Sequence, residues 1–146
     1  MKRKSCGTQR RRGVAILEFA LALPVLLSLV LLAIDYGRVA SCYVAVTNAA
    51  RAGAGYGSAN AYTSATLAAW QAATIQAAKD EFATNPWYNS AKLTVGTPVV
   101  TQEGNGYWRV SVTATYSFQT LINWTVLSNY NTPVSLTRTV VMRATM

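Results

Sequence analysis

A run of apolar residues near the N-terminus constrains this chain more than any other feature of its sequence. From Val14 to Ile34 only Glu18 and Ser28 are polar. An α-helix rises 1.5 Å per residue, so this segment would be roughly 31 Å long, enough to cross the hydrocarbon core of a bilayer. The sequence therefore predicts a membrane-spanning helix with membrane lipid as a partner. A chain of 146 residues leaves room for one small domain beside it.

The net charge of +8 is concentrated in front of the apolar run. From Val14 onward, seven basic and five acidic residues leave a balance of only +2. Basic residues beside a membrane segment are retained in the cytoplasm, which predicts a single-pass protein of the cytoplasmic (inner) membrane with its N-terminus inside and its C-terminal domain outside. A nucleic-acid-binding arm is the rival interpretation. We expect no nucleic acid partner, because an apolar segment follows the basic residues directly. Six of the thirteen basic residues precede the run: Lys2, Arg3, Lys4, Arg10, Arg11 and Arg12.

A cleavable secretory signal also begins with basic and then apolar residues. Its apolar region is normally about 7–15 residues long and ends in small residues. Here the run is longer, and it is followed by Asp35, Tyr36, Gly37 and Arg38. We therefore favour an anchor over an ordinary signal peptide.

Hydrophobic periodicity predicts that the anchor continues as an amphipathic helix to about Ala52. The glycine-rich run at 53–57 is expected to end it. A second helix is predicted from Ser64 to about Thr84, capped by Thr63 or Ser64 and stopped by Asn85-Pro86. The predicted apolar face of the first helix holds Val39, Cys42, Tyr43, Val46 and Ala50, and that of the second holds Leu67, Trp70, Ile75, Ala78 and Phe82.

From Lys92 the pattern alternates as in a β-strand. Leu93 and Val95 indicate an edge or interrupted strand that reaches Pro98. The clearest strand is predicted at 107–118, with a hairpin turn at 103–106 in front of it, and a last strand at about 134–143. The predicted fold class is α+β: a long N-terminal transmembrane and amphipathic helix, a second helix, and a small antiparallel sheet whose apolar face the helices cover.

The expected organisation has three parts. Residues 1–13 form a basic cytoplasmic leader, of which 1–12 are expected to be disordered. Residues 14–34 span the membrane and continue as a helix to about 52, and residues 53–146 form an extracytoplasmic domain. The segment 121–133 is the hardest to interpret; we favour a core position for Trp124, Leu127 and Tyr130 over an apolar loop that meets another subunit.

The residue types argue against catalysis. The chain has no histidine, which is the commonest general base and the commonest metal ligand. Its two cysteines, Cys6 and Cys42, would lie on opposite sides of the membrane and cannot pair within one chain or form a thiolate metal cluster. We expect no enzymatic activity, no metal and no cofactor. Cys42 is expected to be a buried or incidental small residue, and whether it forms an intermolecular disulfide is left open.

The order of features at the N-terminus resembles that of the type IV pilins and pseudopilins: a charged leader, Gly13, Glu18 five residues later, Phe19 and a long apolar helix. More of the sequence resembles the TadE-like minor pseudopilins of the tight-adherence (Tad/Flp) pilus system. The matching stretches are RRRGVAILEFALALPVLL, AIDYGRV, VTNAARAGAGYG and the final VVMRATM. Phe19 stands where major pilins usually have tyrosine, and the chain is longer than those subunits, which favours a minor pseudopilin.

The resemblance implies specific roles. A membrane-embedded prepilin peptidase would cut after Gly13, leaving Val14 as the new N-terminus, and Glu18 would be the functional acid that sets the register of assembly beside Phe19. Implied partners are the prepilin peptidase, other pilins and pseudopilins, and Tad assembly platform proteins. Incorporation into the pilus, retention in the membrane and N-methylation of Val14 are left open.

Two functions follow as hypotheses. The first is a minor pseudopilin processed after Gly13 and involved in assembly of a Tad/Flp-type adhesive pilus. The second is an uncleaved, membrane-anchored protein whose outer domain binds a ligand. A carboxylate is costly in hydrocarbon, so a neighbouring subunit's Glu18 could neutralise the Val14 ammonium in the first hypothesis. In the alternative, the Glu18 side chain snorkels to the lipid headgroups and pairs with no neighbouring subunit.

Overall fold

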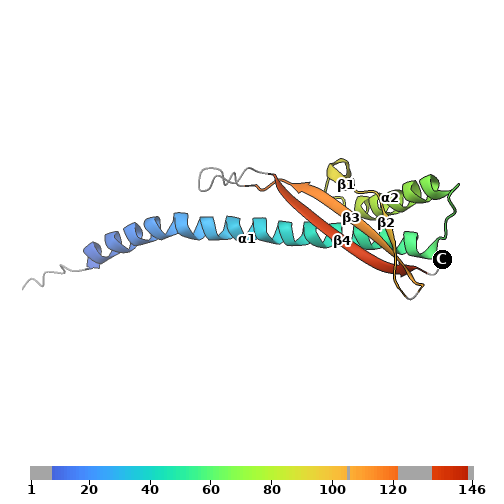
Figure 1. The fold of residues 1–146 in the computed structure, drawn as a ribbon. Coiled ribbons are helices and arrows are strands. Elements are labelled where there is room, and N and C mark those ends of the chain that lie inside the picture. Colours follow the sequence, from blue (N-terminus) through green and yellow to red (C-terminus); the bar gives the residue numbers. More distant parts are fainter. Residues whose placement is uncertain (1–7, 105, 122–132, 145–146) are drawn as a thin grey trace, which may run out of the picture. The chain divides into compact units, whose positions relative to one another are not determined.

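The computed structural model describes residues 8–104, 106–121 and 133–144. The chain divides into two compact units, residues 1–37 and residues 38–146, and we call the second unit the domain. The described part of the first unit is helical throughout. The fold is α+β, as predicted. The elements in chain order (Figure 1) are α1 (Thr8–Ala59), α2 (Leu67–Ala83), the 3₁₀ turn η1 (Ser90–Lys92), β1 (Leu93–Val95), β2 (Val99–Gln102), β3 (Trp108–Phe118) and β4 (Val134–Ala144).

Helix α1 begins earlier than the sequence predicted. Thr8 to Arg12, which we expected to be disordered, already belong to the helix. Arginine and glutamine are good helix formers, and the apolar segment behind them supplies a preformed helix onto which they add. The basic leader and the apolar run are thus joined through a continuous helical backbone at Gly13.

Helix α1 also ends later than predicted, at Ala59 instead of about Ala52. The glycines that we expected to end the helix lie inside it. A Cβ atom added at Gly53 would lie 3.1 Å from the Ala78 Cβ, and one added at Gly57 would lie 2.9 Å from a methyl carbon of Val110. These glycines therefore allow close approach of α2 and the sheet, and this packing outweighs their low helix propensity.

Helix α2 begins three residues after the predicted start and ends as predicted. Its N-cap is Thr66, whose side chain makes no capping hydrogen bond, so the predicted cap at Thr63 or Ser64 is wrong. The Thr66 hydroxyl instead accepts a hydrogen bond of 2.8 Å from the Thr63 backbone N–H. At the other end, α2 stops at Ala83, just before Asn85-Pro86.

Strand β3 is the centre of the sheet. Strand β4 pairs with it antiparallel over its whole length, from Trp108 opposite Ala144 to Phe118 opposite Val134. On the other edge β1 and β2 pair with successive parts of β3, β1 at residues 114–116 and β2 at residues 108–111. The break between β1 and β2 contains Pro98, which agrees with the predicted interruption.

The predicted alternation along β3 is confirmed. Val110, Val112, Ala114, Tyr116 and Phe118 are buried, and the residues between them are partly exposed. The hairpin turn before β3 is also confirmed: the Glu103 N–H donates to the Tyr107 carbonyl (2.7 Å), and Gly106 has a φ of +79°, which favours glycine. The sheet is one-sided, with its apolar face against the helices.

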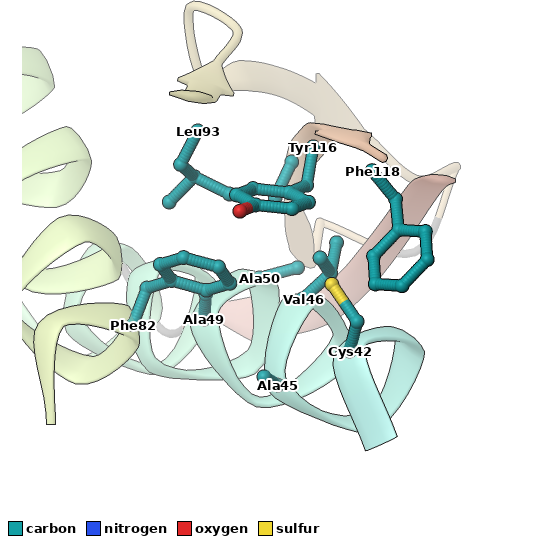
Figure 2. Close-up of a cluster of buried hydrophobic side chains, with 10 residues drawn as sticks. Cys42, Ala45, Val46, Ala49, Ala50, Phe82, Leu93, Tyr116 and Phe118 are labelled. Carbon is teal, nitrogen blue, oxygen red and sulfur yellow. The ribbon is translucent and has the colours of Figure 1, made fainter. Parts of the chain in front are cut away.

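The core has two clusters on that face of the sheet. Figure 2 shows the first, in which Phe82 from α2 lies against Tyr116 from β3, with a distance of 5.2 Å between ring centroids. Burial raises the pKa of the Tyr116 hydroxyl, although a hydrogen bond with the Asn89 backbone opposes this. The first cluster contains Cys42, Ala45, Val46, Ala49, Ala50, Phe82, Leu93, Ala114, Tyr116 and Phe118, and the second contains Ala54, Trp70, Val110, Val112 and Ala144.

Strand β3 is antiparallel to the part of α1 that belongs to the domain. A Cβ atom added at Gly57 would lie 2.9 Å from a Val110 methyl carbon at one end, and the guanidinium carbon of Arg38 lies 5.2 Å from the ring centroid of Phe118 at the other. The two elements match in length, since the 19 helical steps from residue 38 to residue 57 and the 8 strand steps from residue 110 to residue 118 each span about 27–29 Å. The domain therefore has an Arg38 end and a Gly57 end.

Candidate functional site

The predicted processing and register residues lie together on α1. Gly13 and Val14 are helical, so the peptide bond between them is inside the helix. Val14 and Glu18 are one helical turn apart and share a face, whereas Phe19 lies roughly 100° around the helix from Glu18. The Val14 and Phe19 side chains are 54 % and 62 % exposed, and Glu18 is exposed as well. Helical geometry thus brings the predicted cut and the predicted acid close together.

The segment around these residues is apolar on all sides. Its large side chains are each at least 40 % exposed, from Val14 to Ile34. Within the described part of the chain, one helix is long and apolar enough to cross a membrane, and it contains this segment. A helix that is hydrophobic all round is typical of a membrane span. The N-terminal helix therefore fits a membrane-anchored protein.

Glu18 is the one charged side chain in the segment 14–34. Among the side chains that the structure describes, which begin at Val14, its carboxylate has neither a hydrogen bond nor an ion pair. The side chain of a helical residue leans toward the helix N-terminus, which directs Glu18 toward Val14. The carboxylate is therefore available to a group that approaches the same turn.

Pro24 lies inside the helical span, a position at which membrane helices tolerate proline. Proline removes one backbone donor, so the carbonyl of the preceding turn loses its usual partner. The Ser28 hydroxyl donates to the Pro24 carbonyl at 2.7 Å. This bond satisfies the second polar side chain of the apolar segment within its own helix.

The cysteines and the acidic residues are the other candidates for chemistry. Cys42 is a free, fully buried thiol in the first core cluster, which confirms its prediction as a buried small residue. Cys6 lies outside the described residues. Among the residues that the structure describes, no group of His, Cys, Asp or Glu is placed to hold a metal ion. The predicted core positions of Trp124, Leu127 and Tyr130 also lie outside the described residues.

Two tryptophans have different environments, and the prediction of Trp70 on the apolar face of the second helix is confirmed. The Trp70 indole is 5 % exposed, and its Nε1–H donates to the Asn60 carbonyl at 2.8 Å. Trp87, in the turn after α2, is 86 % exposed. The stop signal at Asn85-Pro86 places Trp87 beyond the helix, but no sequence signal indicates that its ring lies in solvent.

Comparison with known proteins confirms the resemblance over the N-terminal helix. Residues 13–55 match the family model of the TadE-like proteins. The match begins at Gly13 and contains Val14, Glu18 and Phe19. The comparisons with curated proteins and with solved structures found no match. This likeness covers residues of α1 alone.

Proposed function

We propose that this chain is a minor pseudopilin that takes part in assembly of a Tad/Flp-type adhesive pilus after a prepilin peptidase has removed residues 1–13. One observation carries the proposal: the TadE-like match begins at Gly13, where the basic leader meets an apolar helix with a single acidic residue. The role is structural and not catalytic. The N-terminus lies in the cytoplasm and the domain outside, because the basic residues are concentrated before Val14.

The helical state of Gly13 has a consequence for cleavage. A peptidase needs an extended substrate, so the helix has to open around the bond between Gly13 and Val14. Only five residues of α1 precede Gly13, and the first four N–H groups of a helix have no intrahelical partner. Glycine also weakens a helix by about 1 kcal/mol relative to alanine. The end of α1 is therefore easily unwound as far as the cut.

Cleavage would create an ammonium group on Val14, one turn from Glu18. An ammonium and a carboxylate are each costly in an apolar environment, and they become tolerable when paired. We propose that the Glu18 carboxylate of a neighbouring subunit pairs with this ammonium. The pair would form at one axial offset between the helices and would thereby set the register of assembly.

The N-terminus of the mature chain tests processing. Intact mass is measured for protein purified from cells that contain the peptidase, for wild type and for Gly13→Ala. Wild type is expected to begin at Val14, and Gly13→Ala is expected to keep the leader. Gly37→Ala is the matched control, because Gly37 is also helical and has open space around its Cβ position. A wild-type chain that keeps residues 2–13 would favour the uncleaved, ligand-binding alternative and reject the proposal.

Glu18→Gln tests the role of the charge, because it keeps the size and removes only the carboxylate. We expect normal processing and a normally folded domain but no piliation. The readouts are intact mass, circular dichroism and electron microscopy of cells. Normal piliation of this variant would show that Glu18 has no partner in assembly, which is the snorkelling alternative.

A further inference from the structure

The chain segments that meet at the Arg38 end of the domain carry exposed apolar side chains and two cations. Trp87 is 86 % exposed, Leu121 is 63 % exposed and Val134 is 42 % exposed. Single exposed apolar residues are normal on a protein surface, whereas a cluster of them marks an interaction site. We define this surface, the Arg38 surface, by five residues: Arg38, Trp87, Lys92, Leu121 and Val134.

Contacts within the domain bring three of these residues to the same end. The Tyr88 hydroxyl donates to the Arg38 backbone carbonyl at 3.3 Å, which ties the turn that carries Trp87 to the point where α1 enters the domain. The Arg38 guanidinium lies over the Phe118 ring. Phe118 is paired with Val134 across the sheet.

The other two residues are placed by the end of β3. The Lys92 Nζ donates to the Gln119 Oε1 at 2.9 Å, directly after Phe118. Leu121 follows Gln119 by two residues. Four segments that are separate in the sequence therefore contribute to the Arg38 surface, at residues 38, 87–92, 121 and 134.

The chain itself ties this end of the domain to the apolar segment. Arg38 follows Ile34 by four residues, which can reach at most about 14 Å even when fully extended. Between them lies Tyr36, which is 77 % exposed. Tyrosine and tryptophan are the residues enriched where a membrane meets water. The Arg38 end is thus the part of the domain that stays near the bilayer surface.

We propose that the Arg38 surface rests on the headgroup region of the bilayer that holds the anchor. Trp87 and Leu121 enter the boundary between headgroups and acyl chains, and Lys92 meets the lipid phosphates. Tryptophan suits this boundary because its ring is apolar and its N–H finds a polar partner. The inference rests on membrane anchoring and is independent of processing at Gly13 and of pilus assembly.

The opposite end of the domain supplies a control within the same chain. Trp108 is at the far end of β3 from Phe118, a distance of about 34 Å at 3.4 Å per residue. A domain that stands on its Arg38 end holds Trp108 away from lipid. A domain that lies flat on the bilayer brings both tryptophans to the surface.

The test uses the full chain reconstituted in vesicles of phosphatidylethanolamine and phosphatidylglycerol, with or without brominated phospholipid as a fluorescence quencher. The emission of Trp87 is the difference between wild type and Trp87→Phe, and that of Trp108 is the difference between wild type and Trp108→Phe. We expect brominated lipid to remove more than half of the Trp87 emission and to leave that of Trp108 unchanged. Leu121→Trp in the Trp87→Phe background is a second reporter and should be quenched in the same way.

Flotation of the vesicles and far-UV circular dichroism confirm insertion and folding of each variant. Trp87 emission that is indifferent to brominated lipid, in a chain that floats with the vesicles, overturns the inference and leaves the pseudopilin proposal intact. It would assign the Arg38 surface to a protein partner. Equal quenching of Trp87 and Trp108 also overturns it, because the domain would then lie flat. A chain that does not float would reject membrane anchoring and both proposals with it.

Discussion

The substitution Gly57→Ala separates helix propensity from packing in α1. Alanine is favoured over glycine in a helix by about 1 kcal/mol, so propensity alone predicts a more stable protein. The structure predicts the opposite sign. The new Cβ atom would lie 2.9 Å from a Val110 methyl carbon, 3.1 Å from the Trp70 ring and 3.4 Å from a Thr74 methyl carbon. Val110 and Trp70 are buried, so they have little room to move away.

Overpacking of a close-packed core costs about 1–3 kcal/mol. Set against the gain in propensity, Gly57→Ala is expected to lower the free energy of unfolding by up to about 2 kcal/mol. Gly55→Ala is the matched control, two residues away on the same helix. Its Cβ atom would meet only the Met142 sulfur at 3.9 Å, an ordinary contact. This variant is expected to gain about 0.5–1 kcal/mol.

The assay is denaturant unfolding of the full chain in detergent micelles, followed by tryptophan fluorescence, since the buried Trp70 reports on this part of the core. The difference between the two variants isolates the overlap, because both make the same change in helix propensity. We expect Gly57→Ala to unfold at a lower denaturant concentration than wild type, and Gly55→Ala at a higher one. Equal midpoints for the two variants would refute the claim that Gly57 permits close packing.

Three further substitutions test the domain by the same unfolding assay. Thr74 has a fully buried hydroxyl without a hydrogen-bond partner among the described residues, so Thr74→Val should raise the free energy of unfolding by about 1 kcal/mol; a loss would reveal a partner for the hydroxyl. Phe82→Ala should lower it by about 3–5 kcal/mol, because the ring is fully buried in the first core cluster; a loss below 1 kcal/mol would contradict that burial. Glu103 bridges Arg109 and Arg143, so Glu103→Gln should lower it by about 1 kcal/mol at low salt and by less at high salt; the same loss at both would exclude an ionic effect.

The sheet could be predicted closely because its signals are local. Alternation from Val110 to Phe118 indicates which side chains face the core, and the pairing with β4 then follows from length and pattern. Pro98 and Gly106 interrupt and turn the chain for reasons that belong to their own backbones. None of these features needs knowledge of a distant residue.

The C-terminal end of α1 was predicted less well because distant contacts decide it. Glycines at 53, 55 and 57 indicate a helix stop when they are considered alone, yet Gly53 and Gly57 fit against Ala78, Val112 and Val110. The buried face of α2 differs for the same reason: Thr74 is fully buried, whereas Ile75, which we expected on that face, is only partly buried. A polar residue in the core cannot be inferred from hydrophobic periodicity.

The candidate site could be predicted from the sequence, whereas the Arg38 surface could not. Sequence alone determined the apolar segment, the position of Gly13 directly before it and of Val14 at its start, and the single acid Glu18 within it, because length, charge and spacing along one helix are properties of the chain. Only the tertiary structure decided that Trp87 is exposed, and that the Lys92 side chain bonds Gln119 next to the end of β3 where Arg38 lies over Phe118. The physical reason is that burial and proximity depend on which segments pack together, and packing joins residues that the sequence holds far apart.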